Sequence, residues 1–178
     1  GASPVDWKPS GSLLIRTRRA TVLPSERLAE VSGPGAMPNF LPIPVAAAGN
    51  YKADGTTLAY TRVREQSNVW VQYRGGQQND LYTLDLATGK HQQLTSNTHD
   101  ETEPLWIGGQ LYFRSEEDGT GNLWSVDPAT KKRTQVTRFK DTNLWSPQTD
   151  GKRIVFVRGT QLELFDQNAT KTIPVRLP

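Results

Sequence analysis

Short apolar runs separated by turn-forming residues follow one another along the chain, and no segment has the spacing of a long amphipathic helix. The clearest runs are residues 13–15, 58–60, 111–113 and 154–156. Runs of this length, bounded by glycine, proline and aspartate, are typical of antiparallel strands. Residues 25–31 could form one helical turn, but their place in the pattern predicts a strand over Arg27–Val31. The pattern therefore predicts an all-β protein.

Each apolar run follows an aromatic residue and a turn that contains glycine. The four landmarks are Trp7 to Gly11, Tyr51 to Gly55, Trp106 to Gly109 and Trp145 to Gly151. Glycine is expected in these turns because it accepts positive φ. Since aromatic side chains recur at what look like equivalent positions, we expect them in the core between neighbouring sheets. This set is Trp7, Tyr51, Trp106, Trp145, Trp124, Tyr112 and Phe156.

A second repeat places an aspartate after a strand at Asp85, Asp127 and Asp166, which stand 42 and 39 residues apart. A period near 40 residues made of short strands is typical of β-propeller blades. We predict a single propeller region over residues 1–178. It has four blades of four antiparallel strands, at about 1–45, 46–98, 99–139 and 140–178. In the third blade the strands are predicted at residues 103–107, 110–115, 122–127 and 133–137.

The second blade breaks this period. From the turn glycine to the blade aspartate there are 30 residues between Gly55 and Asp85, against 18 and 15 in the next two blades. About a dozen residues are therefore inserted within residues 62–79, between the second and third strands. In a propeller, these loops share one face with the connections between blades, and insertions on one face often mark a binding surface.

We predict binding residues on that face, in the insertion and in the matching loop of the first blade. They are Trp70, Tyr73, Arg74, Gly75, Gly76, Arg18, Arg19 and Arg62. Arg64 and residues 116–118, Glu-Glu-Asp, are expected beside them. Two interpretations stay open: a solvated rim of weak salt bridges, or a charged funnel in which Arg74 and the amides after it receive a carboxylate.

Composition removes several classes of chemistry. The chain has no cysteine, which excludes disulfides, thiolate metal sites and thiol nucleophiles. Its net charge is +3 with no polybasic run, so nothing indicates nucleic acid, and no apolar run is long enough to span a membrane. His91 and His99 are expected on opposite faces, so no shared metal site is predicted. No catalytic motif or cofactor fingerprint appears, and no cofactor is expected.

The insertion also carries a family resemblance. Tricorn-type proteases have a segment of the form W-x-x-Y-R-G-G…D-L-W-x-x-D-L, which residues 70–76 and 80–86 resemble. Residues 36–44, 104–108, 111–124 and 134–139 also resemble that family. The residues before Trp70 depart from its usual pattern, and so do residues 114–117, which make that loop more acidic. The resemblance implies the last four blades of an N-terminal six-bladed propeller, preceding domains that hold the catalytic serine and histidine.

The resemblance implies a non-catalytic part of a serine peptidase, which gates or docks oligopeptides or neighbouring domains. Partners would be the remaining blades and domains of that protease or another copy of the chain, unless four blades close on themselves. The alternative is a stand-alone propeller, similar to that of the Tol system, acting as a protein-binding scaffold. A glycan-cleaving propeller would need converging His, Tyr or carboxylates, which the sequence lacks. The absence of cysteine and the bacterial relatives imply a periplasmic or otherwise extracytoplasmic location, with a cytoplasmic one as the alternative.

Overall fold

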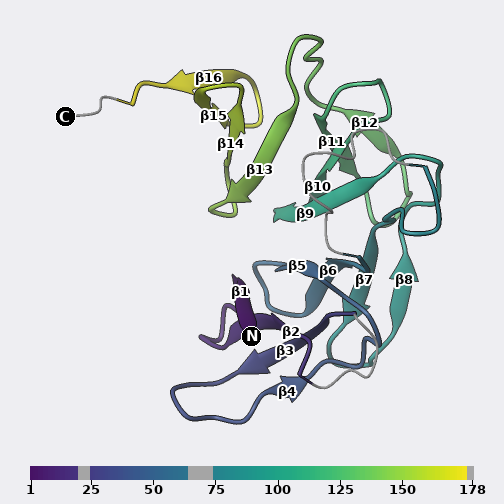
Figure 1. The fold of residues 1–178 in the computed structure, drawn as a ribbon, viewed down its shortest axis with the longest axis vertical. Helices are drawn as coiled ribbons and strands as arrows, with labels where there is room; N and C mark the ends of the chain where they lie inside the picture. Colours follow the sequence, from purple (N-terminus) through teal and green to yellow (C-terminus); the bar gives the residue numbers. More distant parts are fainter. Residues whose placement is uncertain (20–24, 64–73, 176–178) are drawn as a thin grey trace.

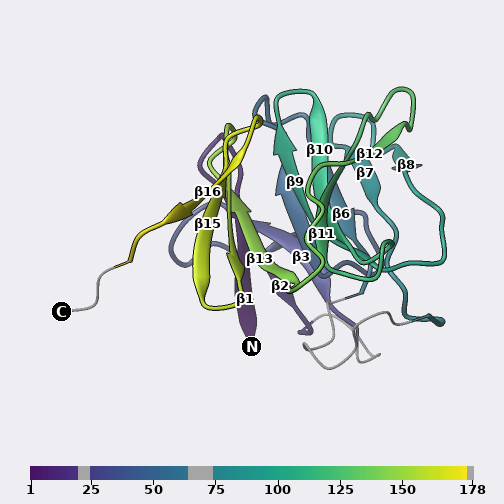
Figure 2. The ribbon, with the colours of Figure 1, turned by 90° about the horizontal axis from the view of Figure 1, so that it is seen from above.

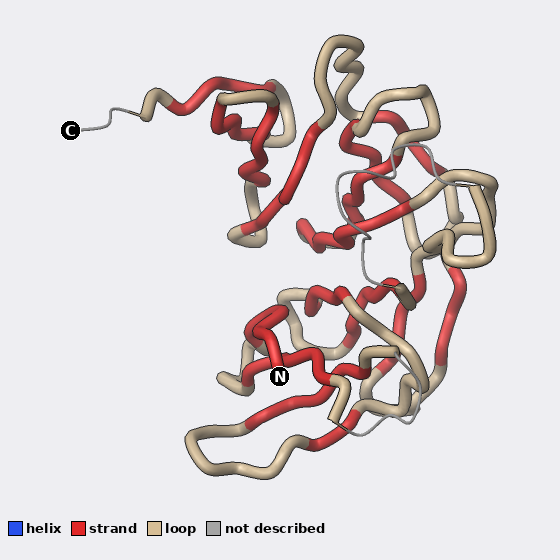
Figure 3. The backbone as a smooth tube through the Cα atoms, viewed as in Figure 1, coloured by secondary structure: helices blue, strands red, loops and turns tan. Residues whose placement is uncertain are grey.

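The computed structural model describes residues 1–19, 25–63 and 74–175, and the regular elements in this part of the chain are all strands (Figure 3). They form four sheets of four strands each. The first sheet contains β1 (Ala2–Trp7), β2 (Leu13–Thr17), β3 (Arg27–Val31) and β4 (Asn39–Phe40). The second contains β5 (Ala48–Tyr51), β6 (Thr57–Thr61), β7 (Tyr82–Asp85) and β8 (His91–Gln93).

The third sheet contains β9 (Glu101–Ile107), β10 (Gln110–Ser115), β11 (Asn122–Val126) and β12 (Arg133–Gln135). The fourth contains β13 (Leu144–Thr149), β14 (Ile154–Arg158), β15 (Gln161–Phe165) and β16 (Thr170–Ile173). In every sheet the strands pair antiparallel in chain order, so each sheet is a simple meander. We number the sheets as blades one to four.

The four blades stand side by side around an arc, which is the arrangement of a β-propeller (Figure 1). The first strand of each blade, β1, β5, β9 or β13, lies on the concave side of the arc. Figure 2 shows the strands running between two faces. The loop face carries the connections between second and third strands and between blades. The turn face carries the tight turns. The predicted all-β propeller is thereby confirmed.

The predicted strand bounds agree with those in the structure to within about two residues, because the sequence signals for strands and turns are local. The strands Arg27–Val31 and Gln110–Ser115 lie where the sequence predicts them. In the third blade, β9 begins two residues earlier than predicted, and β11 and β12 end slightly earlier. The turn glycines of the four landmarks include Gly11, Gly55 and Gly151, each with positive φ.

The core consists of apolar clusters between neighbouring blades rather than a single centre. Between blades one and two the largest fully buried side chains are Leu14, Leu28, Ile43, Leu58 and Leu84. The cluster between blades two and three contains Ala59, Leu81, Leu94, Trp106, Leu111, Phe113 and Val126. The cluster between blades three and four contains Leu105, Ile107, Leu123, Leu144, Ile154, Phe156 and Phe165. Each large buried side chain stabilises the contact between blades by roughly 2–3 kcal/mol.

Two of the aromatic landmarks do not lie where the repeat predicts. Tyr51 and Trp106 are buried between blades, but Trp7 is 66% exposed, because no blade among the described residues packs against that side of blade one. Trp145 is only half-buried. It pairs with Val157, whereas the residue of blade four at the position of Trp106 is Thr149, which pairs with Ile154.

A buried arginine joins blades three and four. Arg114 is 3% exposed, pairs with Glu116, and donates from Nε to the carbonyl oxygen of Leu144 at 2.7 Å. Its guanidinium also lies over the ring of Trp145, 4.0 Å from the centroid. Buried charge of this kind is tolerated only when its partners are all in place.

Gly121 provides the space for this guanidinium, so we predict that Gly121→Ala destabilises the fold. A Cβ at this position would lie 2.9 Å from both Nε and Nη2 of Arg114, closer than atoms can approach. We expect the free energy of unfolding in urea to fall by about 1–3 kcal/mol. Gly109→Ala is the matched control, because its Cβ would meet no atom within 4 Å. Equal stability of the two variants would contradict the prediction.

Candidate functional site

The inner strands of all four blades line one open cavity of about 400 Å³ on the concave side of the arc. Blade one contributes Pro4, Val5, Asp6 and Arg16, and blade two contributes residues 47–50 and Thr61. Blade three contributes residues 102–105, and blade four contributes residues 146–149. The position is that of the central channel of a propeller, and the size is typical of small-ligand sites.

The backbone is strained at two matching points of this lining. Glu103 and Ser146 adopt φ of 54° and 50°, and each directly precedes a proline. Pairing with the second strand shifts register at both places. A non-glycine residue in this region costs on the order of 1–3 kcal/mol. Strain of this kind is often found at functional sites, and here it marks the cavity wall in two neighbouring blades.

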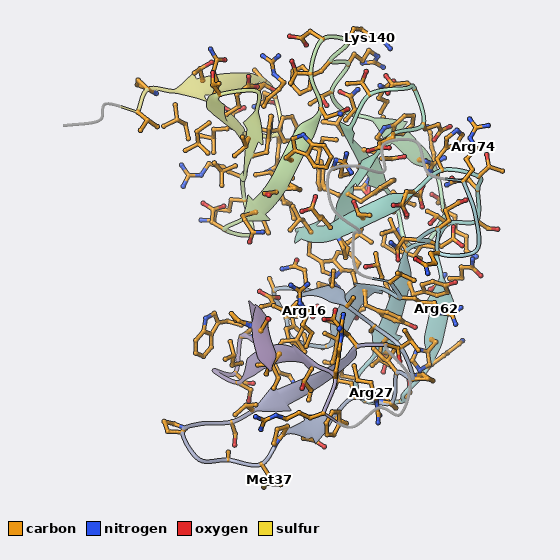
Figure 4. All side chains as sticks on the ribbon, viewed as in Figure 1. Arg16, Arg27, Met37, Arg62, Arg74 and Lys140 are labelled. Carbon is orange, nitrogen blue, oxygen red and sulfur yellow. The ribbon has the colours of Figure 1, made fainter. Side chains whose placement is uncertain are left out.

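The charged residues that line the cavity are Asp6, Arg16 and Glu103. The Asp6 carboxylate accepts hydrogen bonds from the backbone N–H of Tyr51 at 2.7 Å and from Asn50 Nδ2 at 3.0 Å. Burial nevertheless raises the pKa of Asp6. Arg16 lies near the concave side of the arc (Figure 4), where Nη1 donates to the carbonyl oxygen of Ala47 at a long 3.4 Å. Arg16 Nε also lies 4.0 Å from Glu26, so the cavity presents a cation with long contacts beside a carboxylate that is hydrogen-bonded to blade two.

The predicted binding residues are only partly within the described part of the chain. Trp70 and Tyr73, together with Arg64, lie outside the described residues. Arg74, Gly75 and Gly76 are exposed, and Arg74 Nη2 lies 3.4 Å from Nε2 of His99.

In blade one, Arg18 lies 3.8 Å from Glu26, and the backbone N–H of Arg19 donates to Thr17 Oγ1 at 3.2 Å. Arg62 is exposed just after β6. Figure 4 places Arg62 and Arg74 on the outer side of the arc, away from Arg16. The arginines thus belong to the loop-face segments of two blades, and their roles stay predictions.

The acidic residues of the third blade serve that blade. Glu116 pairs with Arg114, while Glu117 lies 2.5 Å from Arg133. Asp118 accepts from Lys140 Nζ at 3.0 Å, and also from Gln135 and Asn122. These carboxylates are held by neighbours within or next to their own blade, so they hold the β10–β11 loop in place.

The two histidines lie in different surroundings. His91 begins β8, where Nδ1 lies 3.0 Å from the Tyr60 hydroxyl and Nε2 lies 3.1 Å from the carbonyl oxygen of Pro42. His99 lies in the connection between blades two and three. Within the described residues, no group of three or more metal-binding side chains comes together, and no helix could cross a membrane.

A fully buried carboxylate fixes the connection that carries His99. Glu101, at the start of β9, accepts from Asn97 Nδ2 at 2.7 Å and lies 2.7 Å from Arg133 Nη2. Burial raises the pKa of Glu101 to about 7, because its effect is larger than that of these partners, which lower the pKa. Because the loop-face connection is held by this group, its ionisation is linked to the local structure.

Sequence reasoning missed the cavity, because its residues look ordinary one at a time. Two signals were present in the chain. Asp6 and Asn50 each directly precede an aromatic landmark, and Glu103 and Ser146 each precede a proline within a strand. Only the curvature of the arc brings these positions together.

We predict that Glu101 makes stability fall with rising pH. The unfolded chain releases this proton near pH 4.5 and the native state near pH 7, so the native state is penalised as the pH rises between them. Relative to the wild type, Glu101→Gln should gain roughly 1–3 kcal/mol of unfolding free energy between pH 5 and pH 8. Urea denaturation at both pH values measures this.

The exposed Asp150 is the control, because hydrogen bonds with Arg153 lower the pKa of its carboxyl to about 2. The free energy of unfolding of Asp150→Asn should differ from that of the wild type by the same amount at pH 5 and at pH 8. The prediction would be contradicted if the unfolding free energy of Glu101→Gln relative to the wild type stayed constant between pH 5 and pH 8, or if it fell.

Comparison with known proteins agrees with this geometry. Residues 1–171 match the family model described as the tricorn protease N-terminal β-propeller domain. The chain is 27% identical over 167 residues to the tricorn protease of Thermoplasma acidophilum. That match covers 93% of this chain and 15% of the relative, so the chain spans a small part of the longer protein.

Two solved structures have the same fold. The crystal structure of the tricorn protease gives a TM-score of 0.86 at 23% identity, covering 99% of this chain and 18% of that chain. TolB from Acinetobacter baumannii gives 0.73 at 14% identity, covering 97% of this chain and 43% of that chain. Because the family model covers nearly the whole chain, this protein belongs to the family of tricorn protease N-terminal β-propeller domains.

Proposed function

We propose that this chain is a non-catalytic propeller portion of a tricorn-like serine peptidase, and that its concave cavity gates or docks oligopeptides. The observation that carries the proposal is the cavity itself, to which the inner strand of every blade contributes. An extended peptide advances about 3.3 Å per residue, so a channel along the inner strands suits a chain better than a compact ligand. The polar lining offers Arg16 to a peptide carboxylate or carbonyl group.

The two ends of the arc support the view that further blades complete it. Trp7 on blade one and Val157 on blade four are 66% and 38% exposed. Large exposed apolar side chains on sheet faces favour association. We propose that the remaining blades of a six-bladed ring, supplied by the longer protease, cover both faces. A second copy of the chain is the alternative source of these contacts.

The second candidate is a TolB-like propeller that acts as a protein-binding scaffold. The likeness to TolB favours it, although at 14% identity this likeness concerns the fold alone. The two candidates differ in the longer protein. A peptidase predicts peptide hydrolysis that changes when the propeller is altered, whereas a scaffold predicts partner capture without hydrolysis.

We predict that a bulky side chain at Gln148 restricts passage. Gln148 is exposed and lines the cavity, so Gln148→Trp narrows it without removing a core contact. In the longer protein, hydrolysis of a peptide of about ten residues should slow at least threefold, and that of a short chromogenic peptide should not change. Gln148→Ala should leave both rates unchanged. Equal rates of long-peptide hydrolysis for Gln148→Trp and the wild type would overturn gating.

We predict that Arg74 contributes to docking on the loop face. Among the described residues, its exposed guanidinium makes a long 3.4 Å contact with His99, which leaves donors for a carboxylate. Arg74→Ala should weaken binding of a labelled oligopeptide about tenfold, equivalent to ~1.4 kcal/mol, measured by fluorescence anisotropy. Arg74→Lys keeps the charge and should lose less. Unchanged affinity of Arg74→Ala would remove this residue from the proposal.

A further inference from the structure

Neighbouring blades meet in wedges that open onto the turn face, opposite the loop face. The first wedge lies between blades one and two, and the second lies between blades two and three. Because the blades are repeats, strand register defines which residues are equivalent in the two wedges. Comparing them shows what each one contains and what the second one lacks.

The first wedge is filled by a closed polar network. The Glu30 carboxylate oxygen Oε1 accepts the Tyr51 hydroxyl at 2.6 Å and Lys8 Nζ at 2.8 Å. Lys8 also lies over the Tyr51 ring, 5.6 Å from its centroid. Burial, with the Glu30 charge beside it, raises the pKa of Tyr51, so its hydroxyl stays a donor. Beneath this network, Asp6 accepts the Tyr51 backbone N–H.

Register identifies the counterparts in the second wedge. Asp6, Leu14 and Glu30 form one cross-strand row in blade one, and the corresponding row in blade two is Asn50, Ala59 and Thr83. In the next row, Trp7 corresponds to Tyr51, and in blade three to Trp106. Lys8 and Lys52 each follow the aromatic of their own blade.

One contact confirms the equivalence and shows the difference. The backbone N–H of Trp106 donates to Asn50 Oδ1 at 2.7 Å, as that of Tyr51 donates to Asp6 at 2.7 Å. Asn50 in the second wedge occupies the position of Asp6 in the first wedge, and Thr83 occupies the position of Glu30. Two carboxylates are thus replaced by neutral side chains, while the lysine is kept.

The second wedge is left with an open groove of about 390 Å³, lined by residues that include Lys52, Thr83 and Trp106. Trp106 is 5% exposed, and its indole Nε1 has no hydrogen-bond acceptor among the described residues. Thr83 is 6% exposed and too short to fill the place of Glu30. Within the described part of the chain, Lys52 pairs with the exposed Asp54, at 2.9 Å. A buried donor without an acceptor is costly, so this place suits an acceptor.

Two aspartates also line this groove, and each uses one carboxylate oxygen in its own turn. Asp85 Oδ1 accepts the backbone N–H groups of Ala87 and Thr88, and Asp127 Oδ1 accepts those of Ala129 and Thr130. The same hydrogen bonds with Thr88 lower the pKa of Asp85. Lys90 adds a second cation to the lining, and Gln92 spans to the carbonyl oxygen of Pro128 at 3.4 Å.

We propose that the second wedge is a binding site for a carboxylate, which takes the place that Glu30 occupies in the first wedge. The carboxylate accepts hydrogen bonds from the Trp106 indole N–H and from Lys52, which turns away from Asp54. The ligand is a free dicarboxylate or an acidic side chain of a peptide. The site lies on the face opposite the loop face and does not rest on the proposed peptidase function.

The test follows the indole N–H signal of Trp106 in the nuclear magnetic resonance spectrum of the 178-residue chain, assigned with Trp106→Phe. The probes are glutarate and the blocked tripeptide acetyl-Ala-Glu-Ala-amide, with acetyl-Ala-Gln-Ala-amide as the uncharged control. We expect a saturable downfield shift with at least one acidic probe and none with the control. A response to glutarate alone identifies a small-molecule site, and a response to the acidic peptide identifies a peptide site.

Three variants test whether the carboxylate binds where the repeat predicts. Thr83→Glu supplies the missing acid from the chain, so the indole signal should move downfield without ligand and binding should fall at least tenfold. Thr83→Gln has the same size without the charge, and its unliganded signal should move less. Lys52→Gln removes the cation and should weaken binding at least fivefold.

The absence of a saturable shift with both acidic probes overturns the proposal, as does an equal response to the uncharged peptide. If Thr83→Glu fails to fold, Lys52→Gln decides alone, because Lys52 is at the surface of the groove. Unchanged affinity in that variant would also overturn the proposal.

Discussion

The structure depends on contacts that join neighbouring blades, and at the first two junctions these contacts are made by the inner strands. A polar side chain at the end of β1 or β5 accepts the backbone N–H of an aromatic residue in the following blade: Asp6 binds Tyr51, and Asn50 binds Trp106. The aromatic ring then enters the apolar cluster between the blades. A four-stranded sheet of this size cannot bury its faces alone, so stability comes from these contacts between repeats.

That dependence explains where the molecule can vary. The apolar clusters must be filled in every wedge, but the polar layer above them changes from one wedge to the next. In the first wedge Lys8, Glu30 and Tyr51 close it, and in the second the acid is missing. The cavity on the concave side arises from the same geometry, because inner strands held at their ends leave space between them. Scaffold and candidate sites are therefore parts of one arrangement.

Much of the fold follows from the sequence, because its signals are local. Strand Arg27–Val31 and the aspartate turns at Asp85, Asp127 and Asp166 follow from apolar runs and turn chemistry, and the structure has both. The error at Trp145 has a local cause as well. Blades three and four share a register shift, but Trp106 follows the irregular residue Glu103 whereas Trp145 precedes Ser146, and a spacing pattern does not separate the two cases.

The candidate sites were harder to predict, because they are made by the packing of blades. Trp7 matches Tyr51 in sequence, yet its burial depends on a neighbour that the described residues do not include. The cavity draws on all four blades and the second wedge on two, through residues such as Asn50 and Thr83 that carry no motif. The family resemblance of the insertion is sound, but Trp70 and Tyr73 lie outside the described residues, so their role stays a prediction.

Acrylamide quenching of Trp7 fluorescence tests the open arc most directly, with the Trp7 signal obtained as the difference between the wild type and Trp7→Phe. It should be measured on the 178-residue chain, shown to be monomeric by light scattering, and on the longer protein. The account predicts that Trp7 is readily quenched in the monomeric chain and shielded in the longer protein, where another blade covers it. Shielding in the monomer, or equal quenching in both proteins, would contradict the account.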